Sequence, residues 1–315
     1  MSRILLAGLA VLILAGSPAG LGQEPAPTGA ETPTETPVPA PTPTPASSAP
    51  DPVLIGAGDI ADCSEIESAR KTAELIEKIP GTVFTLGDNA YGSGTPAQFA
   101  NCYAPTWGRF KDRTRPAVGN HDYQTAGAAG YFAYFGEAAG DPKKGYYSYD
   151  LGAWHVVVIN SNCRKIGGCR RGSPQEKWLR KDLAAHPALC TLAIWHHPRF
   201  SSAEHGDDRT MRDIWKALSD AGAEVALSGH DHDYERFAPV DGRGRADPER
   251  GMREFVAGTG GRHLYDWGLV HQTSEVRNNQ TFGVLKLTLH PASYDWEFVP
   301  VAGSTFTDSG SSKCH

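Results

Sequence analysis

Two histidines and two aspartates alternate in the segment Gly229–Arg236, which reads GHDHDYER. In an extended chain, residues two positions apart share a face, so both imidazoles could simply point at water. The segment follows the apolar run 223–228, which is typical of a buried strand. Because ligands in open α/β sheets bind beyond the carboxyl ends of the strands, this position favours a binding role.

Polar side chains follow other apolar runs in the same way. Asp59 follows the run 53–58, Asp88 and Tyr91 follow 83–87, Asn120 and His121 follow 116–118, and His196 follows 190–195. A single Gly-Asp after a strand is more often a turn, since both residues suit turn geometry. Repeated strand ends that carry carboxylate, amide, phenol and imidazole groups instead predict one shared site at the edge of a sheet.

These residue types suit a pair of metal ions. Imidazole binds zinc and iron, oxygen ligands suit harder cations, and one carboxylate can bridge two ions. Ions about 3.5–4 Å apart hold both oxygens of an in-line displacement and lower the pKa of bound water, which is the chemistry of phosphate ester hydrolysis. A single structural zinc needs only four closed ligands. The strand ends offer more candidates than that, and none is a cysteine.

Short apolar strands and amphipathic helices must position these residues. We expect strands over 53–58, 83–87, 116–118, 154–160, 190–195 and 224–228, followed by 252–258, 282–290 and 294–301. A capping box at Ser64–Glu67 and the pair Ser173-Pro174 predict two helix starts, and a third helix is expected from about Asp208 to Gly222. This order predicts an α/β layered domain with mixed sheets, whose last part is a β-meander.

The N-terminal residues differ in composition from the rest of the chain. Residues 1–22 are typical of a secretory signal peptide, with Arg3 before an apolar run and small residues after it. An uncleaved membrane anchor is the alternative, although the run is short for a membrane span. Residues 23–51, rich in Pro, Thr, Ala and Glu, predict a disordered spacer. We therefore expect one folded domain over 52–315 in a secreted protein.

The charge and the cysteines narrow the class of protein. A net charge of -6 argues against binding to a nucleic-acid backbone. Six cysteines in an exported chain favour disulfides over free thiols or metal ligands, and no pair has Cys-x-x-Cys spacing. Cys163 and Cys169 flank a Gly-Gly turn and are expected to pair. Of the three connectivities open to the other four, we favour Cys63–Cys102 with Cys190–Cys314.

The strand-end motifs, taken in order, resemble the blocks of calcineurin-like metallophosphoesterases. They are Asp59, Gly87-Asp88-x-x-Tyr91, Gly119-Asn120-His121-Asp122, His196 and Gly229-His230-x-His232. Most of that superfamily carries Asp-x-His in the first block, whereas this chain has Asp59-Ile60-Ala61. Tyr91 stands where purple acid phosphatases use a tyrosinate, so the chain resembles that subgroup. The resemblance spans essentially 52–315 and implies an α/β/β/α-type sandwich with the metal site at the strand carboxyl ends.

The match departs from the family in two respects. Ala61 occupies a position that is usually glycine in the first block. The Pro/Thr-rich spacer stands in place of the N-terminal β-sandwich domain of the plant enzymes, so the resemblance is to a compact bacterial-type form. The resemblance therefore implies no oligomeric state, because any dimer contact that the plant enzymes make through their extra domain does not apply to this chain.

The resemblance also implies a role for each residue. Asp59, Asp88, Tyr91 and His232 would hold a ferric ion, and Asn120, His196 and His230, with Asp88 as a bridge, would hold iron(II), zinc or manganese. His121 and His205 would face the substrate and stabilise charge on the phosphoryl group or protonate the leaving oxygen. Asp122 and Asp231 are expected to support loops, and His197 to lie either beside a ligand or at the surface.

The implied function is that of a secreted acid phosphatase that hydrolyses small-molecule phosphate monoesters. A phosphodiesterase or nucleotidase on the same metal centre is the alternative within the enzyme class. A non-catalytic metal-binding module at the cell surface is the alternative outside it, and it would be expected to have lost ligands. All seven metal positions and His121 are present, which favours an enzyme. Beyond export, no membrane partner is expected.

Overall fold

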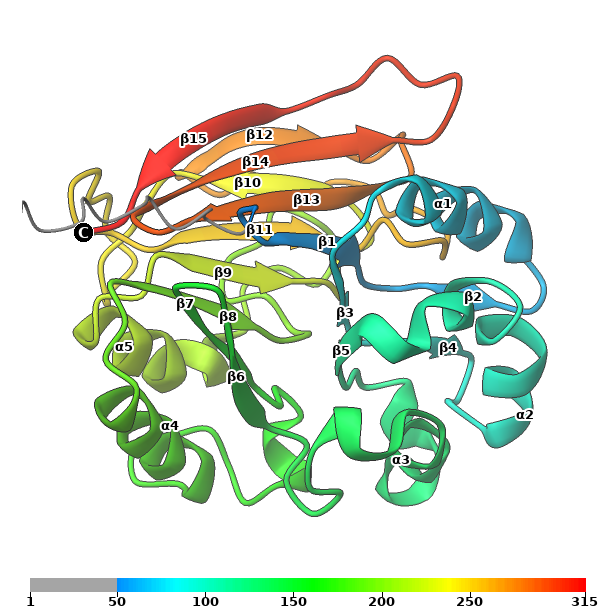
Figure 1. Ribbon diagram of the computed structural model, residues 1–315, viewed down its shortest axis with the longest axis horizontal. Coiled ribbons are helices and arrows are strands. Elements are labelled where there is room, and N and C mark those ends of the chain that lie inside the picture. Colours follow the sequence, from blue (N-terminus) through cyan, green and yellow to red (C-terminus); the bar gives the residue numbers. More distant parts are fainter. Residues whose placement is uncertain (1–49) are drawn as a thin grey trace, which may run out of the picture. The chain divides into compact units, whose positions relative to one another are not determined.

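The computed structural model describes residues 50–315, in which two large mixed β-sheets pack face to face (Figure 1). The first sheet has the strand order β15-β14-β13-β1-β3-β5 and the second has the order β12-β10-β11-β9-β8-β7-β6. The strands of the first sheet are β1 (Val53–Ala57), β3 (Thr82–Leu86), β5 (Thr114–Ala117), β13 (Gly283–His290), β14 (Ser293–Pro300) and β15 (Ser309–Lys313). Those of the second are β6 (Tyr147–Leu151), β7 (Trp154–Val158), β8 (Cys190–Ile194), β9 (Val225–Ser228), β10 (Tyr234–Phe237), β11 (Arg253–Ala257) and β12 (Ser274–Asn278).

The centre of each sheet is parallel. β1, β3 and β5 run parallel in the first sheet, and β7, β8, β9 and β11 run parallel in the second. All residues of β7, β8 and β9 are buried, as is usual for parallel strands covered on both faces. A small sheet joins β2 (Ala61–Asp62) to β4 (Ala90–Tyr91). The parallel strands therefore present their carboxyl ends to a common edge in each sheet.

Helices cover the outer faces of the two large sheets. α1 (Ile66–Lys78) and α3 (Ala129–Phe135) pack on the first sheet, and α4 (Pro174–Ala185) and α5 (Arg212–Asp220) pack on the second. The short helix α2 (Pro96–Gln98) has no buried residue and lies next to α3. Short 3-10 or π segments lie at Phe99–Tyr103, Trp107–Arg113, Asp122–Gln124, Ala126–Ala128, Gly136–Ala139, Cys163–Lys165 and Arg209–Met211. In Figure 1, α4 and α5 lie side by side next to β7 and β8, on the opposite side from α1.

The alternation of side chains along each strand builds the layers. Leu54 packs between the sheets, whereas its neighbour Ile55 packs under the helices of the first sheet. In the second sheet, Val156 faces the inter-sheet core and Val157 packs with Trp215 of α5. Because successive residues of a strand point to opposite faces, one apolar run supplies two cores. The predicted α/β/β/α-type sandwich is confirmed.

All of the predicted strands are present, but one of them lies outside the predicted C-terminal meander. The run 252–258 forms β11, which pairs parallel with β9 in the second sheet. The predicted C-terminal meander is present as β13, β14 and β15, but the run 252–258 is not part of it. The strands β6, β10, β12 and β15 were not predicted. Most residues of β6, β12 and β15 are incompletely buried, since these are edge strands without a long apolar run.

The predicted helix starts were correct in part. Ser64 does not cap α1, because its hydroxyl donates to Asp62 at 2.6 Å and the helix begins at Ile66 without a side-chain cap. Ser173 does cap α4, since its hydroxyl accepts from the backbone N–H of Glu176. Before α5, Asp208 accepts from the N–H of Thr210 at 2.7 Å, and beyond it Gly222 ends the helix at a φ of 75°.

The three predicted disulfides are present. They join Cys63 to Cys102, Cys163 to Cys169 and Cys190 to Cys314. The predicted signal peptide and spacer lie outside the described residues, except for Pro50 and Asp51 at the end of the spacer. Within residues 50–315, no helix has the length and apolar character that a membrane crossing requires.

Candidate metal centre

The residues expected to bind metal ions or substrate lie where the carboxyl ends of β1, β3, β5, β8 and β9 meet. Two backbone hydrogen bonds close this edge. The N–H of Gly58 donates to the carbonyl of Ala257 at 2.8 Å, and the N–H of Gly229 donates to the carbonyl of His196 at 3.0 Å. The first of these joins β1 to β11 and so ties the first sheet to the second. Side chains that are far apart in the sequence are thereby held at one place.

Tyr91 is the centre of one group of side chains. Its phenol oxygen lies 2.8 Å from Asp59 Oδ1, 3.1 Å from Asp88 Oδ2 and 3.0 Å from His232 Nε2. His232 Nε2 is in turn 3.4 Å from Asp59 Oδ1. All four side chains are buried. The four residues predicted to hold the first ion therefore direct one atom each to a common point.

His196 is the centre of the second group. Its Nε2 atom lies 2.8 Å from Asn120 Oδ1 and 3.3 Å from Asp88 Oδ2. The His230 ring lies edge-on to the His196 ring, with centroids 4.9 Å apart. The same carboxylate oxygen, Oδ2 of Asp88, thus faces both groups. This shared oxygen is the arrangement expected of a carboxylate that bridges two cations.

The charges of the site are coupled through Asp88. Burial alone would raise the pKa of Asp88, but the imidazole of His196 beside it outweighs burial and lowers that pKa below its usual range. Burial likewise opposes a charge on His196, yet Asp88 raises the pKa of His196 to about 9. Burial, followed by the carboxylates of Asp59 and Asp88, raises the pKa of Tyr91 well above its ordinary value. A cation at this point would reverse the effect on the phenol, because it would favour the tyrosinate.

The donor set fits metal ions rather than a closed hydrogen-bond network. Burial and the neighbouring imidazoles of His196 and His197 lower the pKa of His230, which keeps that imidazole neutral. Within residues 50–315, the ring nitrogens of His230 form no hydrogen bond, and only its backbone N–H is used, to Asp59 Oδ2 at 2.8 Å. A neutral imidazole with a free lone pair, next to two buried carboxylates, is typical of a metal ligand.

Backbone carbonyls fix the orientation of two candidate ligands. His196 Nδ1 lies 2.7 Å from the carbonyl oxygen of Leu86, and His232 Nδ1 lies 2.7 Å from that of His263. Each contact uses the ring nitrogen that points away from the site and leaves Nε2 directed into it. Metal-binding histidines are commonly held in this way.

The backbone itself is constrained at three candidate ligands. Asp59, Asp88 and His230 have φ values of 60°, 48° and 70°. Residues other than glycine adopt this left-handed conformation at a cost of about 1–3 kcal/mol, and they do so mainly at functional sites. At these positions the chain turns sharply after a strand, which aims the side chains back toward the strand ends.

The two predicted catalytic histidines lie at the rim. His121 is partly exposed, and its backbone N–H donates to Asp88 Oδ1 at 2.8 Å while its Nε2 is 3.9 Å from Asp88 Oδ2. The His205 ring lies 4.3 Å from that of His230, measured between centroids. A 3.0 Å hydrogen bond to Asp231 raises the pKa of His205. Both rings are therefore beside the candidate ligands and accessible from solvent.

Neighbouring polar residues support the loops, as expected for Asp122 and Asp231. Asp122 accepts hydrogen bonds from the N–H of Gly119 and from the Asn89 side chain, both at 2.9 Å. Asp231 accepts from Ser201 and from the N–H of His205. Neither carboxylate is directed into the two groups around Tyr91 and His196. His197 is half-buried beside a candidate ligand, with its ring 4.9 Å from that of His196 between centroids, and its Nδ1 lies 2.8 Å from the Ser161 hydroxyl.

One residue near the site had no signal in the sequence. Tyr265 stacks on the ring of His232, with centroids 3.8 Å apart and an interplanar angle of 13°. It lies in an irregular segment between β11 and β12, where no motif or periodicity marks it. Only the path of that segment across the strand ends places it there.

Sequence comparison decides the family. The profile described as calcineurin-like phosphoesterase matches residues 47–234, which is more than half of the chain. The chain belongs to the calcineurin-like phosphoesterases. The resemblance inferred from the strand-end motifs is thus confirmed.

Within this family, the chain is similar to purple acid phosphatases. It is 32% identical to purple acid phosphatase 22 of Arabidopsis thaliana over 126 residues, which are 37% of this chain and 27% of that relative. It is 24% identical to a nucleotide pyrophosphatase/phosphodiesterase of Hordeum vulgare over 70% of this chain and 69% of the relative. The part of the chain that aligns thus spans only about a quarter of the Arabidopsis protein.

A solved structure supports the fold. The purple acid phosphatase from yellow lupin (Lupinus luteus) seeds superimposes with a TM-score of 0.65 at 21% identity, over 84% of this chain and 54% of that chain. At this level of identity the likeness establishes the fold alone. The activity must be argued from the residues at the strand ends.

Proposed function

We propose that this calcineurin-like phosphoesterase is a secreted dinuclear-metal phosphatase that hydrolyses phosphate monoesters. The observation that carries the proposal is the position of Asp88 Oδ2, which faces Tyr91 on one side at 3.1 Å and His196 on the other at 3.3 Å. Asp59, Asp88, Tyr91 and His232 would hold a ferric ion. Asn120, His196 and His230 would complete the site of iron(II), zinc or manganese. The pair of ions would activate water and neutralise phosphate charge.

The protein's own groups would orient the ester and supply protons. His121, which lies at the rim beside Asp88, would donate a hydrogen bond to a phosphoryl oxygen. His205 would protonate the leaving oxygen, since its contact with Asp231 favours the imidazolium. Asp231 would act as a positioning residue that fixes the His205 ring. Secretion is supported by the three disulfides, which persist in oxidising compartments, and by the predicted signal peptide.

A phosphodiesterase on the same centre is the second candidate. The similarity to the barley nucleotide pyrophosphatase/phosphodiesterase favours it. The two activities differ in what the site must accept, because a diester carries one negative charge less and a second alcohol group. We expect the purified, metal-loaded protein to hydrolyse an aryl phosphate monoester at least tenfold faster than the matching aryl diester, measured as kcat/KM. The opposite order would replace the monoesterase proposal with the diesterase.

The ferric assignment rests on Tyr91. Iron-containing protein is expected to show a visible tyrosinate-to-iron charge-transfer band, and Tyr91→Phe is expected to lose the band because the phenol oxygen is its donor. Tyr265→Phe is the matched control, since Tyr265 stacks on His232 but is not one of the candidate ligands. An absorption spectrum and an iron assay on the three proteins would decide. Wild-type protein with neither iron nor a visible band would contradict the ferric assignment.

A further inference from the structure

A second group of histidine and aspartate side chains lies outside the candidate metal centre, at the C-terminal end of α4. His155 comes from β7, Asp150 from the edge strand β6, and Asp182 and His186 from the last turn of α4 and the residue after it. One possible ligand atom from each of His155, Asp182 and His186 lies within 4.8 Å of the others. The function proposed above uses none of these residues.

His155 is held as metal-binding histidines are commonly held. Its side chain is buried, and its Nδ1 lies 2.7 Å from Asp150 Oδ1. That contact fixes the ring and directs the other nitrogen, Nε2, toward Asp182 Oδ2 at 3.0 Å. A carboxylate that orients an imidazole through the nitrogen away from the ion is a recurrent feature of zinc sites.

Asp182 and His186 complete the group. The second oxygen of Asp182 accepts from the Ser148 hydroxyl at 2.8 Å, so this carboxylate is also oriented by a neighbour. The His186 ring lies parallel to that of His155, with centroids 4.8 Å apart and an interplanar angle of 12°. His186 Nδ1 lies 2.9 Å from the backbone carbonyl oxygen of Asp182, which orients this ring as well, and 3.6 Å from Asp182 Oδ1. Both carboxylates, Asp150 and Asp182, would offset the charge of a dication.

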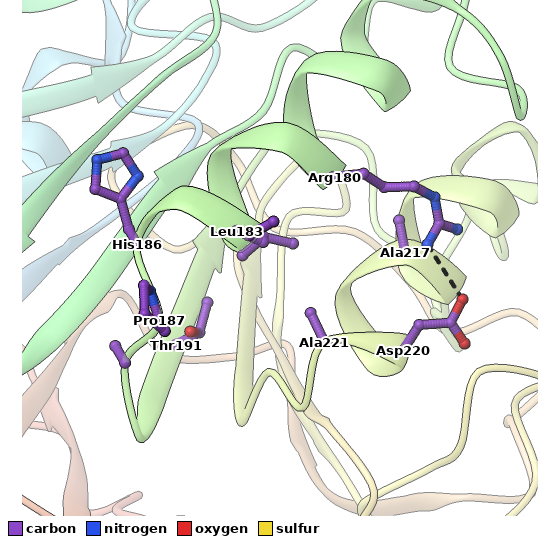
Figure 2. Close-up of a pocket in the computed structure, with 10 residues that line it drawn as sticks. Arg180, Leu183, His186, Pro187, Thr191, Ala217, Asp220 and Ala221 are labelled. Atoms are coloured by element: carbon purple, nitrogen blue, oxygen red, sulfur yellow. Dashed lines mark hydrogen bonds and ion pairs between the residues drawn. The ribbon is translucent and has the colours of Figure 1, made fainter. Parts of the chain in front are cut away.

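The surroundings leave one side of the group open. The His186 side chain is 48% exposed. Figure 2 shows His186 at one end of the pocket between α4 and α5, with the Arg180–Asp220 ion pair at the other end. That pair has an N–O distance of 3.3 Å, so the charge of Arg180 is already matched. Water can therefore reach the group from the side of His186.

We propose that His155, Asp182 and His186 bind a divalent transition metal ion of the zinc type, with water as the fourth ligand. Two imidazoles and one carboxylate suit tetrahedral zinc better than magnesium or calcium, which prefer oxygen ligands. The ion would join the end of α4 to β7 and, through Asp150, to the edge strand β6. The alternative is that the same four side chains form only a hydrogen-bonded network that holds α4 on the sheet.

The test is a zinc titration of the purified protein, after the metal bound on isolation has been counted by elemental analysis. We expect wild-type protein to bind one further zinc ion per chain by isothermal titration calorimetry. His186→Ala, at an exposed position after a helix, is expected to lose that equivalent while keeping its fold. Asp150→Asn is expected to weaken binding by about 10–100-fold, because it removes only the group that orients His155.

His290→Ala is the matched control. His290 also lies between two carboxylates, at 2.6 Å from Asp51 and 3.0 Å from Asp295. If zinc binds through the proposed ligands, this variant keeps the further equivalent. Absence of that equivalent in wild-type protein, or its persistence in His186→Ala, would overturn the zinc proposal and leave the hydrogen-bonded network. Phosphatase activity is not a readout here, so this result is independent of the proposed function.

Discussion

Replacing His196 by alanine is expected to lower the turnover of a phosphate monoester by about a thousandfold or more. A metal ion contributes several kcal/mol to stabilising the charge of such a transition state, and about 4 kcal/mol corresponds to this factor. His196 is fully buried, and its Nε2 atom faces both Asn120 Oδ1 and Asp88 Oδ2. Its removal would take the central ligand from the second ion. Metal analysis is therefore expected to show one ion fewer per chain.

The control for this variant is a histidine outside the site. His290→Ala, at the end of β13, is expected to keep both turnover and metal content. Circular dichroism would establish that His196→Ala is folded before its kinetics are compared. Unchanged turnover in folded His196→Ala would contradict the proposed ligand set, whereas lost turnover with full metal content would assign His196 a role other than binding.

The sequence was most informative where apolar strands end in polar residues. The run 53–58 is followed by Asp59 and the run 190–195 by His196, and the structure places both side chains at one edge. Such strands are buried on both faces, so their composition alone marks them. The edge strand β12 has alternating exposed residues and no apolar run, and its position depends on pairing with β10. Local composition does not encode that pairing.

Interactions between distant segments were the hardest to predict. Tyr265 reaches His232 only because the segment after β11 crosses the strand ends. His155 lies 27 positions from Asp182 in the chain, on a strand whose other residues are apolar. Ser64 had the spacing of a cap, but its hydroxyl donates to Asp62 instead. In each case the decisive partner is set by tertiary packing or by a competing local hydrogen bond, which residue type and spacing do not determine.

Close packing at the strand ends explains why a glycine precedes Asn120. A Cβ atom on Gly119 would lie 2.0 Å from Asp88 Oδ1 and 2.1 Å from Asp88 N. Contacts this short cannot be relieved by rotating one flexible side chain, because one of them is to backbone. Asp88 already adopts a φ of 48°, so its backbone has little freedom to retreat. The absence of a side chain at residue 119 is thus a condition for the position of Asp88.

Gly119→Ala is therefore expected to lower kcat by about 100-fold or more, since a misplacement of about 1 Å at a reacting centre has effects of this size. Because Asp88 faces both groups, this variant is also expected to lose the visible band that depends on Tyr91. Overpacking is expected to lower the free energy of unfolding by about 1–3 kcal/mol. Gly242→Ala is the control, since its nearest contact would be the Ser219 hydroxyl at 3.3 Å. These expectations are checked by measuring the turnover, the visible spectrum and the denaturant unfolding curve of both variants. A Gly119→Ala protein that keeps its band and loses only turnover would mean that Asp88 does not bridge the two groups.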